Sequence, residues 1–376
     1  MVRCLTVLAI VPLAVPCAIY LSHVLYFAGT SCESKMMLTG KTVIVTGANT
    51  GIGKTTASDM AARGARVILA CRSAARALPV VKEIQELTKN SAVVFMQLDL
   101  ASFQSVRDFA RLFLEKEERL DVLINNAGMI SSDEPKLSRD GIEMTLAVNH
   151  LGPFLLTNLL VDIMKTSGPG ARVVTVSSVL HNLANPAAFR DFDLLKTDGA
   201  SNFQENLNLG HMDNQLSQLS GIRLSVLPYL PNDIKRKFLG MLSPKVIRYN
   251  NSKLANILFA KELAKRLAAT GVSSYALHPG VIITTEIGVE RSSAGQNEPV
   301  PASVQGFMYV FGKLVKNQKE GAQTTICCAV SERFANESGN YYSDCNLMEV
   351  RRLEANPQLA AEFWDWSATV VGLKEN

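Results

Sequence analysis

The sequence predicts an α/β protein built on a doubly wound parallel sheet. Short β-branched runs, which read as buried strands, alternate with longer segments of helical periodicity along most of the 376 residues. A glycine-rich turn follows the first strand, and polar groups directly follow several others. This alternation gives right-handed crossovers, and it places a ligand site outside the carboxyl ends of the strands.

The first strand is expected at Lys41–Thr46, before the turn Gly47-Ala48-Asn49-Thr50-Gly51-Ile52-Gly53 and a helix over Lys54–Arg63. This is the phosphate-binding device of Rossmann-type folds, because glycines allow close backbone approach and a helix start presents free N–H groups. The spacing Gly-x-x-x-Gly-x-Gly differs from the commoner Gly-x-Gly-x-x-Gly. Taken alone, the stretch also fits a tight turn without a ligand.

The second strand, Ala65–Cys71, ends on Arg72, and no acidic residue occurs from Ala65 to Ala75. NAD enzymes usually place Asp or Glu near this point to bind the ribose 2′-hydroxyl, whereas an arginine pairs with a 2′-phosphate. The sequence therefore favours NADP(H). The alternative is that Arg72 is a solvated loop charge.

The remaining elements continue the alternation and carry the polar groups. We expect a helix over 74–87, a strand over 92–98 ending in Asp99, a helix over 103–115, a strand over 121–124 followed by Asn125-Asn126-Ala127-Gly128, a helix over 141–165 carrying Asn149, a strand over 172–176 followed by Ser177-Ser178, a helix around Tyr249, a strand over 272–277 followed by His278-Pro279-Gly280, and a tail helix over 357–373.

Tyr249 and Lys253 are four residues apart, which places them on one face of a helix. A nearby ammonium favours the phenolate, so we expect Lys253 to lower the pKa of Tyr249 from its usual value of about 10. Such a tyrosine passes a proton efficiently at the working pH. The pair alone is weak evidence and gains meaning from the motifs that precede it.

Composition excludes several other classes of protein. The hydrophobic content of 47% and only 7 cysteines indicate a core-forming chain without a disulfide scaffold. The cysteines show no paired spacing typical of a structural zinc site, so no metal is expected. A net charge of +4 is too balanced to indicate a nucleic-acid partner.

The N-terminus differs in kind from the rest. From Cys4 to Ala28 there is no Asp, Glu, Lys or Arg, and the segment is long enough to cross a bilayer. We interpret residues 1–28 as a retained signal anchor, 29–40 as a linker and 41–372 as one catalytic domain. Cleavage near Ala28 is the alternative.

The motifs together resemble the short-chain dehydrogenase/reductase family over residues 38–372. They are Thr46–Gly53, Asn125-Asn126-Ala127-Gly128, Asn149, Ser178, Tyr249-x-x-x-Lys253 and Pro279-Gly280. Ala70-Cys71-Arg72, the stretch Val148–Phe154 and Ser252-Lys253-Leu254-Ala255-Asn256 are similar to the membrane-anchored retinol dehydrogenase branch.

The resemblance implies a role for each site residue. Tyr249 would be the general acid or base, Lys253 would lower its pKa and bind the nicotinamide ribose, and Ser178 rather than Ser177 would polarise the substrate oxygen. Asn149 would hold a water in the proton relay, or, as the alternative, bond nearby backbone. The implied cofactor positions are Gly47, Asn49, Thr50, Gly51, Ile52, Gly53, Arg72, Asp99, Asn126, Tyr249, Lys253 and Thr284, although Thr285 leaves the alignment at Thr284 open.

Ser178 and Tyr249 are much farther apart than in the family, and the excess lies between about 197 and 243. A tolerated surface insertion, a gene-model artefact and a basic-apolar segment touching the membrane or the substrate mouth are the alternatives. The apolar stretch Val281–Lys316 is expected to form the substrate lid.

The leading hypothesis is an NADP(H)-dependent oxidoreductase for a hydrophobic, retinoid-like alcohol or aldehyde. A steroid or xenobiotic carbonyl reductase and an inactive NADP-binding scaffold are the alternatives. The expected partners are a small hydrophobic substrate and the membrane, and a homo-oligomer stays open. The resemblance implies the endoplasmic reticulum with the catalytic domain cytosolic, with a mitochondrial membrane as the alternative.

Overall fold

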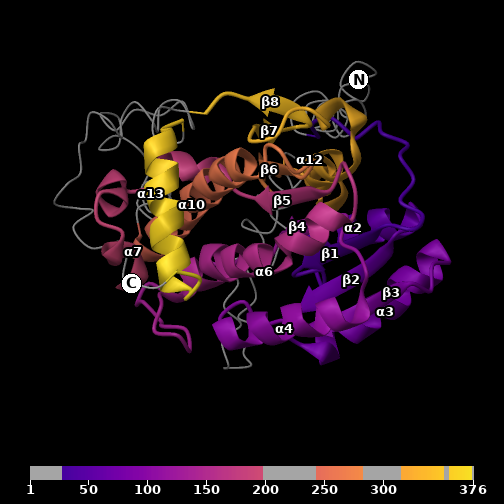
Figure 1. Cartoon of the computed structure of the whole chain (residues 1–376), viewed down its shortest axis with the longest axis horizontal. Helices are drawn as coiled ribbons and strands as arrows, with labels where there is room; N and C mark the ends of the chain where they lie inside the picture. Colours follow the sequence, from indigo (N-terminus) through magenta and orange to yellow (C-terminus); the bar gives the residue numbers. More distant parts are fainter. Residues whose placement is uncertain (1–27, 198–242, 283–314, 351–354, 375–376) are drawn as a thin grey trace, which may run out of the picture.

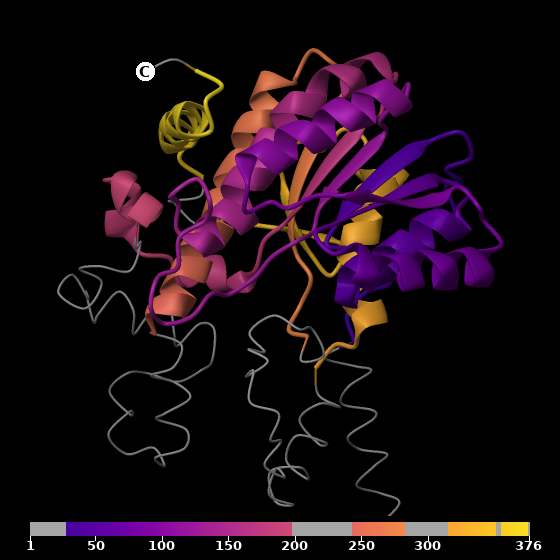
Figure 2. The ribbon, with the colours of Figure 1, turned by 90° about the horizontal axis from the view of Figure 1, so that it is seen from below.

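The computed structural model describes residues 28–197, 243–282, 315–350 and 355–374. The expected signal anchor, the insertion and most of the expected lid lie outside the described residues. What is described is a central sheet between two layers of helices (Figures 1 and 2).

In the part of the chain that the structure describes, eight strands form one sheet in the order β3-β2-β1-β4-β5-β6-β7-β8. All neighbouring pairs are parallel except β7 and β8. The predicted doubly wound parallel sheet is therefore confirmed, with one antiparallel strand added at its edge. The strands are β1 Thr42–Thr46, β2 Arg66–Cys71, β3 Val93–Gln97, β4 Val122–Asn125, β5 Arg172–Val176, β6 Ser273–His278, β7 Tyr341–Ser343 and β8 Asn346–Met348.

The helices bury apolar side chains against both faces of the sheet. One core joins α4, α6, α10 and α13 to the first face, and the other joins α2, α3 and α12 to the second. The helices are α2 Gly51–Ala62, α3 Ala74–Thr88, α4 Phe103–Lys116, α5 Met144–Leu146, α6 Gly152–Thr166, α7 Asp193–Thr197, α10 Pro244–Arg266, α12 Gln318–Val330 and α13 Pro357–Val370, with the 3-10 turns η3 Val179–Leu183, η4 Pro186–Phe189 and η6 Glu332–Phe334 and the π-helical turn η2 Ala147–Leu151.

Local chemistry explains where these elements begin. The five residues of β1 are β-branched and all buried, as expected for a central strand covered on both faces. The side chain of Ser102 caps α4 by accepting the N–H of Ser105 at 3.4 Å. At the start of α12, Asn317 and Glu320 exchange hydrogen bonds as a capping box.

The helix expected over 141–165 is divided in the structure. Glu143 caps α5, which continues through η2 into α6. Among the described residues, Met144–Thr166 is the one stretch long and apolar enough to cross a membrane, but 72% of its most apolar window is buried in the protein. It is a core helix of this fold.

Candidate active site

The polar motifs meet at one edge of the sheet. Thr46 ends β1, Asn125 ends β4, Val176 ends β5 and His278 ends β6. Because these strands are parallel neighbours, their carboxyl ends lie side by side. The residues that follow them therefore surround a common space, as the sequence predicts.

The glycine-rich turn is itself the first turn of a helix. α2 begins at Gly51, three residues earlier than expected, and its first turn holds no acidic residue. Gly47 and Gly51 have φ of 67° and 59°, which favour glycine. A Cβ on Gly53 would lie 2.4 Å from Nδ2 of Asn126 and 2.6 Å from the carbonyl oxygen of Gly47. The glycines thus permit a close-packed cradle at a helix N-terminus, the arrangement that binds phosphate.

Asn126 is fixed to this cradle by Thr46, a residue to which sequence reasoning gave no role. The Thr46 hydroxyl accepts the N–H groups of Asn126 and Ala127 at 3.0 Å each. The Asn126 amide donates to the carbonyl oxygen of Thr46 at 2.8 Å. Its Oδ1 atom is buried and accepts no hydrogen bond from the described residues. That oxygen is available to a donor on a ligand.

Arg72 and Asp99 lie at the same edge. Arg72 directly follows β2 and is exposed. Asp99 follows β3 and is half-buried, and its carboxylate accepts the N–H of Ala101 at 3.1 Å. Both residues are placed where the adenosine end of a dinucleotide would extend from the glycine turn.

The four candidate catalytic residues come from three elements. Tyr249 and Lys253 lie on α10, Ser178 caps η3 after β5, and Asn149 lies in η2. Their exposed fractions are 8%, 2%, 8% and 1%, respectively. The Lys253 ammonium lies 5.3 Å from the centroid of the Tyr249 ring and donates to the carbonyl oxygen of Val176 at 3.0 Å.

Burial dominates the titration of both groups on α10. It raises the pKa of Tyr249 to about 12, against a smaller lowering by a hydrogen bond with the Ser178 side chain. Burial also lowers the pKa of Lys253 to about 8. The expected lowering of the Tyr249 pKa is therefore wrong for this site, because desolvation of the phenol outweighs the hydrogen bond with Ser178.

The structure separates the two neighbouring serines. Ser177 is 2% exposed, and its hydroxyl donates to the carbonyl oxygen of Lys253 at 2.6 Å, which ties β5 to α10. The Ser178 hydroxyl accepts the N–H of Leu180 at 3.2 Å and hydrogen-bonds Tyr249. Ser178 is thus the serine that accompanies the tyrosine hydroxyl, and its role on the substrate oxygen stays a prediction.

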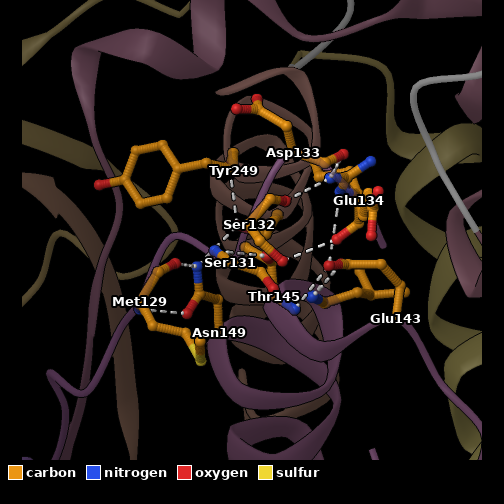
Figure 3. A network of polar contacts seen from close by, with 12 residues as sticks. Met129, Ser131, Ser132, Asp133, Glu134, Glu143, Thr145, Asn149 and Tyr249 are labelled. Carbon is orange, nitrogen blue, oxygen red and sulfur yellow. Dashed lines mark hydrogen bonds and ion pairs between the residues drawn. The ribbon is translucent and has the colours of Figure 1, made fainter. Parts of the chain in front are cut away.

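Asn149 joins two parts of the site (Figure 3). Its Oδ1 accepts the N–H of Met129 at 2.8 Å, and its Nδ2 donates to the Met129 carbonyl at 2.9 Å and to the Ser252 hydroxyl at 3.0 Å. Ser252 in turn donates to the carbonyl oxygen of Tyr249 at 2.7 Å. The backbone contacts that the sequence offered as an alternative are present, and the water-holding role stays a prediction.

Gly128 belongs to the motif after β4, but the sequence alone assigned it no role in the site. A Cβ there would lie 3.4 Å from Nζ of Lys253 and 3.6 Å from Oδ1 of Asn149. The glycine lets the chain after β4 pass close to both groups. Thr284 lies outside the described residues.

Comparison with known proteins gives a consistent assignment. Residues 41–188 match the family model described as short chain dehydrogenase. The chain is 37% identical over 350 residues to retinol dehydrogenase 12 of Homo sapiens, covering 93% of this chain and 92% of that protein. It is 39% identical over 349 residues to retinol dehydrogenase 13 of Homo sapiens, with coverage of 93% and 90%.

Solved structures share the fold. An uncharacterized protein from Mycobacterium paratuberculosis matches with a TM-score of 0.58 at 26% identity, covering 92% of this chain and 98% of that one. A short chain dehydrogenase from Escherichia coli CFT073, complexed with NADPH, matches with a TM-score of 0.53 at 18% identity, with coverage of 83% and 99%. The second likeness is one of fold alone.

Proposed function

Since this chain belongs to the retinol dehydrogenase branch of the short-chain dehydrogenase family, we propose that it is an NADP(H)-dependent oxidoreductase that interconverts a hydrophobic, retinoid-like alcohol and its aldehyde. The observation that carries the proposal is the grouping of Ser178, Tyr249 and Lys253 beside the glycine cradle at one sheet edge. A buried phenol beside a buried ammonium in such a place is typical of a site that transfers protons.

The described residues fit a nicotinamide dinucleotide. The tight packing of Gly53 against Asn126 leaves the N–H groups of the first α2 turn to a pyrophosphate, and the unpartnered Oδ1 of Asn126 would accept a donor from the nucleotide. Exposed Arg72 would pair with the 2′-phosphate of NADP(H), and Asp99 would bind the adenine edge. The cofactor, when bound, supplies or accepts the hydride.

The protein side of the reaction is a proton transfer. During carbonyl reduction, the Tyr249 hydroxyl donates its proton to the substrate oxygen, which Ser178 holds by a hydrogen bond. The protonated Lys253 then stabilises the phenolate that remains. In alcohol oxidation the same phenolate removes the hydroxyl proton. Asn149 fixes the turn after β4 beside Lys253 and would hold the relay water.

The substrate class is inferred from the relatives and the sequence. Several relatives are named retinol dehydrogenases, and the stretch Val281–Lys316 carries apolar residues suited to a hydrophobic substrate. The segment Cys4–Ala28 would anchor the chain in a membrane, which we place at the endoplasmic reticulum with the catalytic domain in the cytosol. A lipid substrate dissolved in that membrane would then be near the catalytic domain.

The test is a turnover panel of retinal, steroid ketones and small aldehydes, each with NADPH and with NADH. Retinal and NADPH are expected to give the highest kcat/KM. A preference for steroid ketones would instead support the carbonyl reductase alternative, and tight NADPH binding without turnover would support the scaffold alternative.

Tyr249→Phe is the matched variant for this panel, because it removes the transferable proton and little volume. We expect kcat to fall by about 10²- to 10⁴-fold, the usual contribution of general acid–base catalysis, while NADPH affinity stays near that of the parent protein. Turnover equal to the parent protein would contradict the assignment.

A further inference from the structure

A buried ion pair lies directly behind the catalytic helix turn. Arg248 precedes Tyr249 on α10, and its Nε atom lies 3.6 Å from Oε1 of Glu143. Both side chains are 1% exposed. A pair removed so completely from water is costly unless each partner makes further hydrogen bonds, so its contacts indicate what it holds in place.

Glu143 is bound to the start of the helix that carries Asn149. Its two carboxylate oxygens accept the N–H of Thr145 at 2.9 Å and the N–H of Leu146 at 2.8 Å. The carboxylate therefore caps α5, which continues into η2. Burial raises the pKa of Glu143, and these hydrogen bonds and the charge of Arg248 oppose that rise.

Arg248 is bound to the loop between β4 and α5. Its Nη2 atom donates to the carbonyl oxygens of Ser132 and Asp133, each at 2.7 Å. The side chain of Lys245, one turn earlier on α10, pairs with the Asp133 carboxylate at 2.9 Å. The first turns of α10 are thus fastened to the stretch 132–133, a few residues after Met129.

These contacts belong to a closed chain of hydrogen bonds that includes the backbone of Tyr249. The loop joins Met129 to Asn149, Asn149 bonds Ser252, and Ser252 bonds the carbonyl oxygen of Tyr249. Figure 3 shows the Tyr249 ring pointing away from Glu143, so that the Glu143 carboxylate and the phenol lie in different directions. The contacts of Arg248 and Glu143 therefore fix the orientation of α10, and with it the direction in which the Tyr249 side chain points.

Resting on the function proposed above, we propose that Arg248 and Glu143 are positioning residues for the reaction. They hold the first turns of α10 in register with the Asn149 helix, and thereby fix where the Tyr249 hydroxyl meets the substrate oxygen. Neither residue touches the reacting atoms. The hydrogen bonds described for the pair run to α5 and to residues 132–133, and not to the glycine turn between β1 and α2.

The test uses Arg248→Met in the full chain, with Arg172→Met as its matched control. Arg172 is also a buried arginine, 5% exposed, and it donates to the carbonyl oxygen of Cys328 at 3.1 Å. It begins β5, so it lies at the opposite end of that strand from Ser178. Both variants should unfold at lower temperature than the parent protein.

Only Arg248→Met should change the chemical step. We expect its kcat to fall by about 10- to 100-fold, as for a small misplacement of a reacting group. The NADPH dissociation constant should stay within about twofold of the parent value. Arg248→Lys keeps a cation but has a single nitrogen, so it cannot face Glu143 as Nε does and also bond both carbonyls as Nη2 does; its kcat should lie between those of the parent and Arg248→Met.

The outcomes separate the two proposals. Equal kcat in Arg248→Met and Arg172→Met overturns the positioning role, and if Arg248→Met does not fold, a parent-like kcat in Arg248→Lys overturns it instead. A reduced kcat with unchanged NADPH binding supports it. If the parent protein turns over no substrate of the panel, the proposed function is refuted. That result would not bear on whether Arg248 and Glu143 hold α10 in place.

Discussion

Single residues set the chemistry of this site through burial. Tyr249 and Lys253 are almost completely enclosed, and enclosure moves their pKa values in opposite directions, to about 12 and about 8. The phenol therefore keeps its proton at neutral pH, which is the form that the proposed carbonyl reduction would use. The ammonium is charged below about pH 8 and loses its proton above it.

A pH profile of carbonyl reduction follows from these two values. We expect kcat/KM for reduction to be level below about pH 8 and to fall above it, because neutral Lys253 no longer stabilises the phenolate. Lys253→Arg stays protonated across this range, so its alkaline fall should move to higher pH even if its rate is lower. Identical alkaline limbs in both proteins would show that another group titrates.

Arg72 tests the choice of cofactor. Its exposed guanidinium would meet only the 2′-phosphate, so Arg72→Ala should raise the dissociation constant of NADPH by about 10- to 100-fold, the value of one charge-assisted hydrogen bond, and leave that of NADH nearly unchanged. The measurement is fluorescence titration of both nucleotides. Equal weakening of the two would assign Arg72 a structural role.

At the scale of elements, α13 holds the first face of the sheet together through aromatic contacts. Phe363 is 1% exposed and lies with its ring centroid 4.9 Å from His150, 5.2 Å from Phe192 and 5.4 Å from Trp366. These partners come from η2, the segment before α7 and α13 itself. The tail helix expected from the sequence is thus part of the core and not an appendage.

Phe363→Ala should lower the free energy of unfolding by about 3–5 kcal/mol, because it leaves a cavity among these rings. Urea denaturation measures the loss, and Leu87→Ala is the control, since Leu87 is 72% exposed on α3 and its truncation should cost less than about 0.5 kcal/mol. Similar losses for both variants would mean that α13 does not contribute to the folding unit.

Elements with strong local patterns were predictable and those without were not. β5 was predicted at Arg172–Val176, where the structure has it, because its β-branched run is distinctive. α12 escaped prediction because most of its thirteen residues are buried, which removes the contrast between an apolar and a polar face. β7 and β8 have three residues each, too short to show an alternating pattern.

The same distinction applies within the site. Ser178, Tyr249 and Lys253 lie in short motifs that local sequence reveals. The hydroxyl of Ser177, the cap by Glu143 and the clamp by Arg248 depend on partners that only the folded chain brings near. No local spacing indicates such pairs, and the strength of burial on Tyr249 is likewise a property of the whole packing.

At the scale of the whole molecule, the proposed membrane attachment depends on residues before the described domain. Full-length protein should stay with membranes during alkaline carbonate extraction, whereas a chain beginning at Ser34 should be much more extractable, because Cys4–Ala28 supplies the apolar span. Immunoblotting of pellet and supernatant measures the difference. A shortened, soluble full-length product would indicate cleavage near Ala28.

The strand order also has a consequence for synthesis on the ribosome. β1 pairs with β2 on one side and with β4 on the other. The second pairing cannot form until β4 has been synthesised. Thr42 and Asp121 are hydrogen-bonded at that side and are 79 residues apart. At translation rates of about 5–20 residues per second, that edge stays unpaired for roughly 4 to 16 seconds. During this interval the apolar run Val43–Val45 offers a free strand edge to neighbouring nascent chains, so this interior strand of the finished sheet is one that a chaperone would need to protect during synthesis.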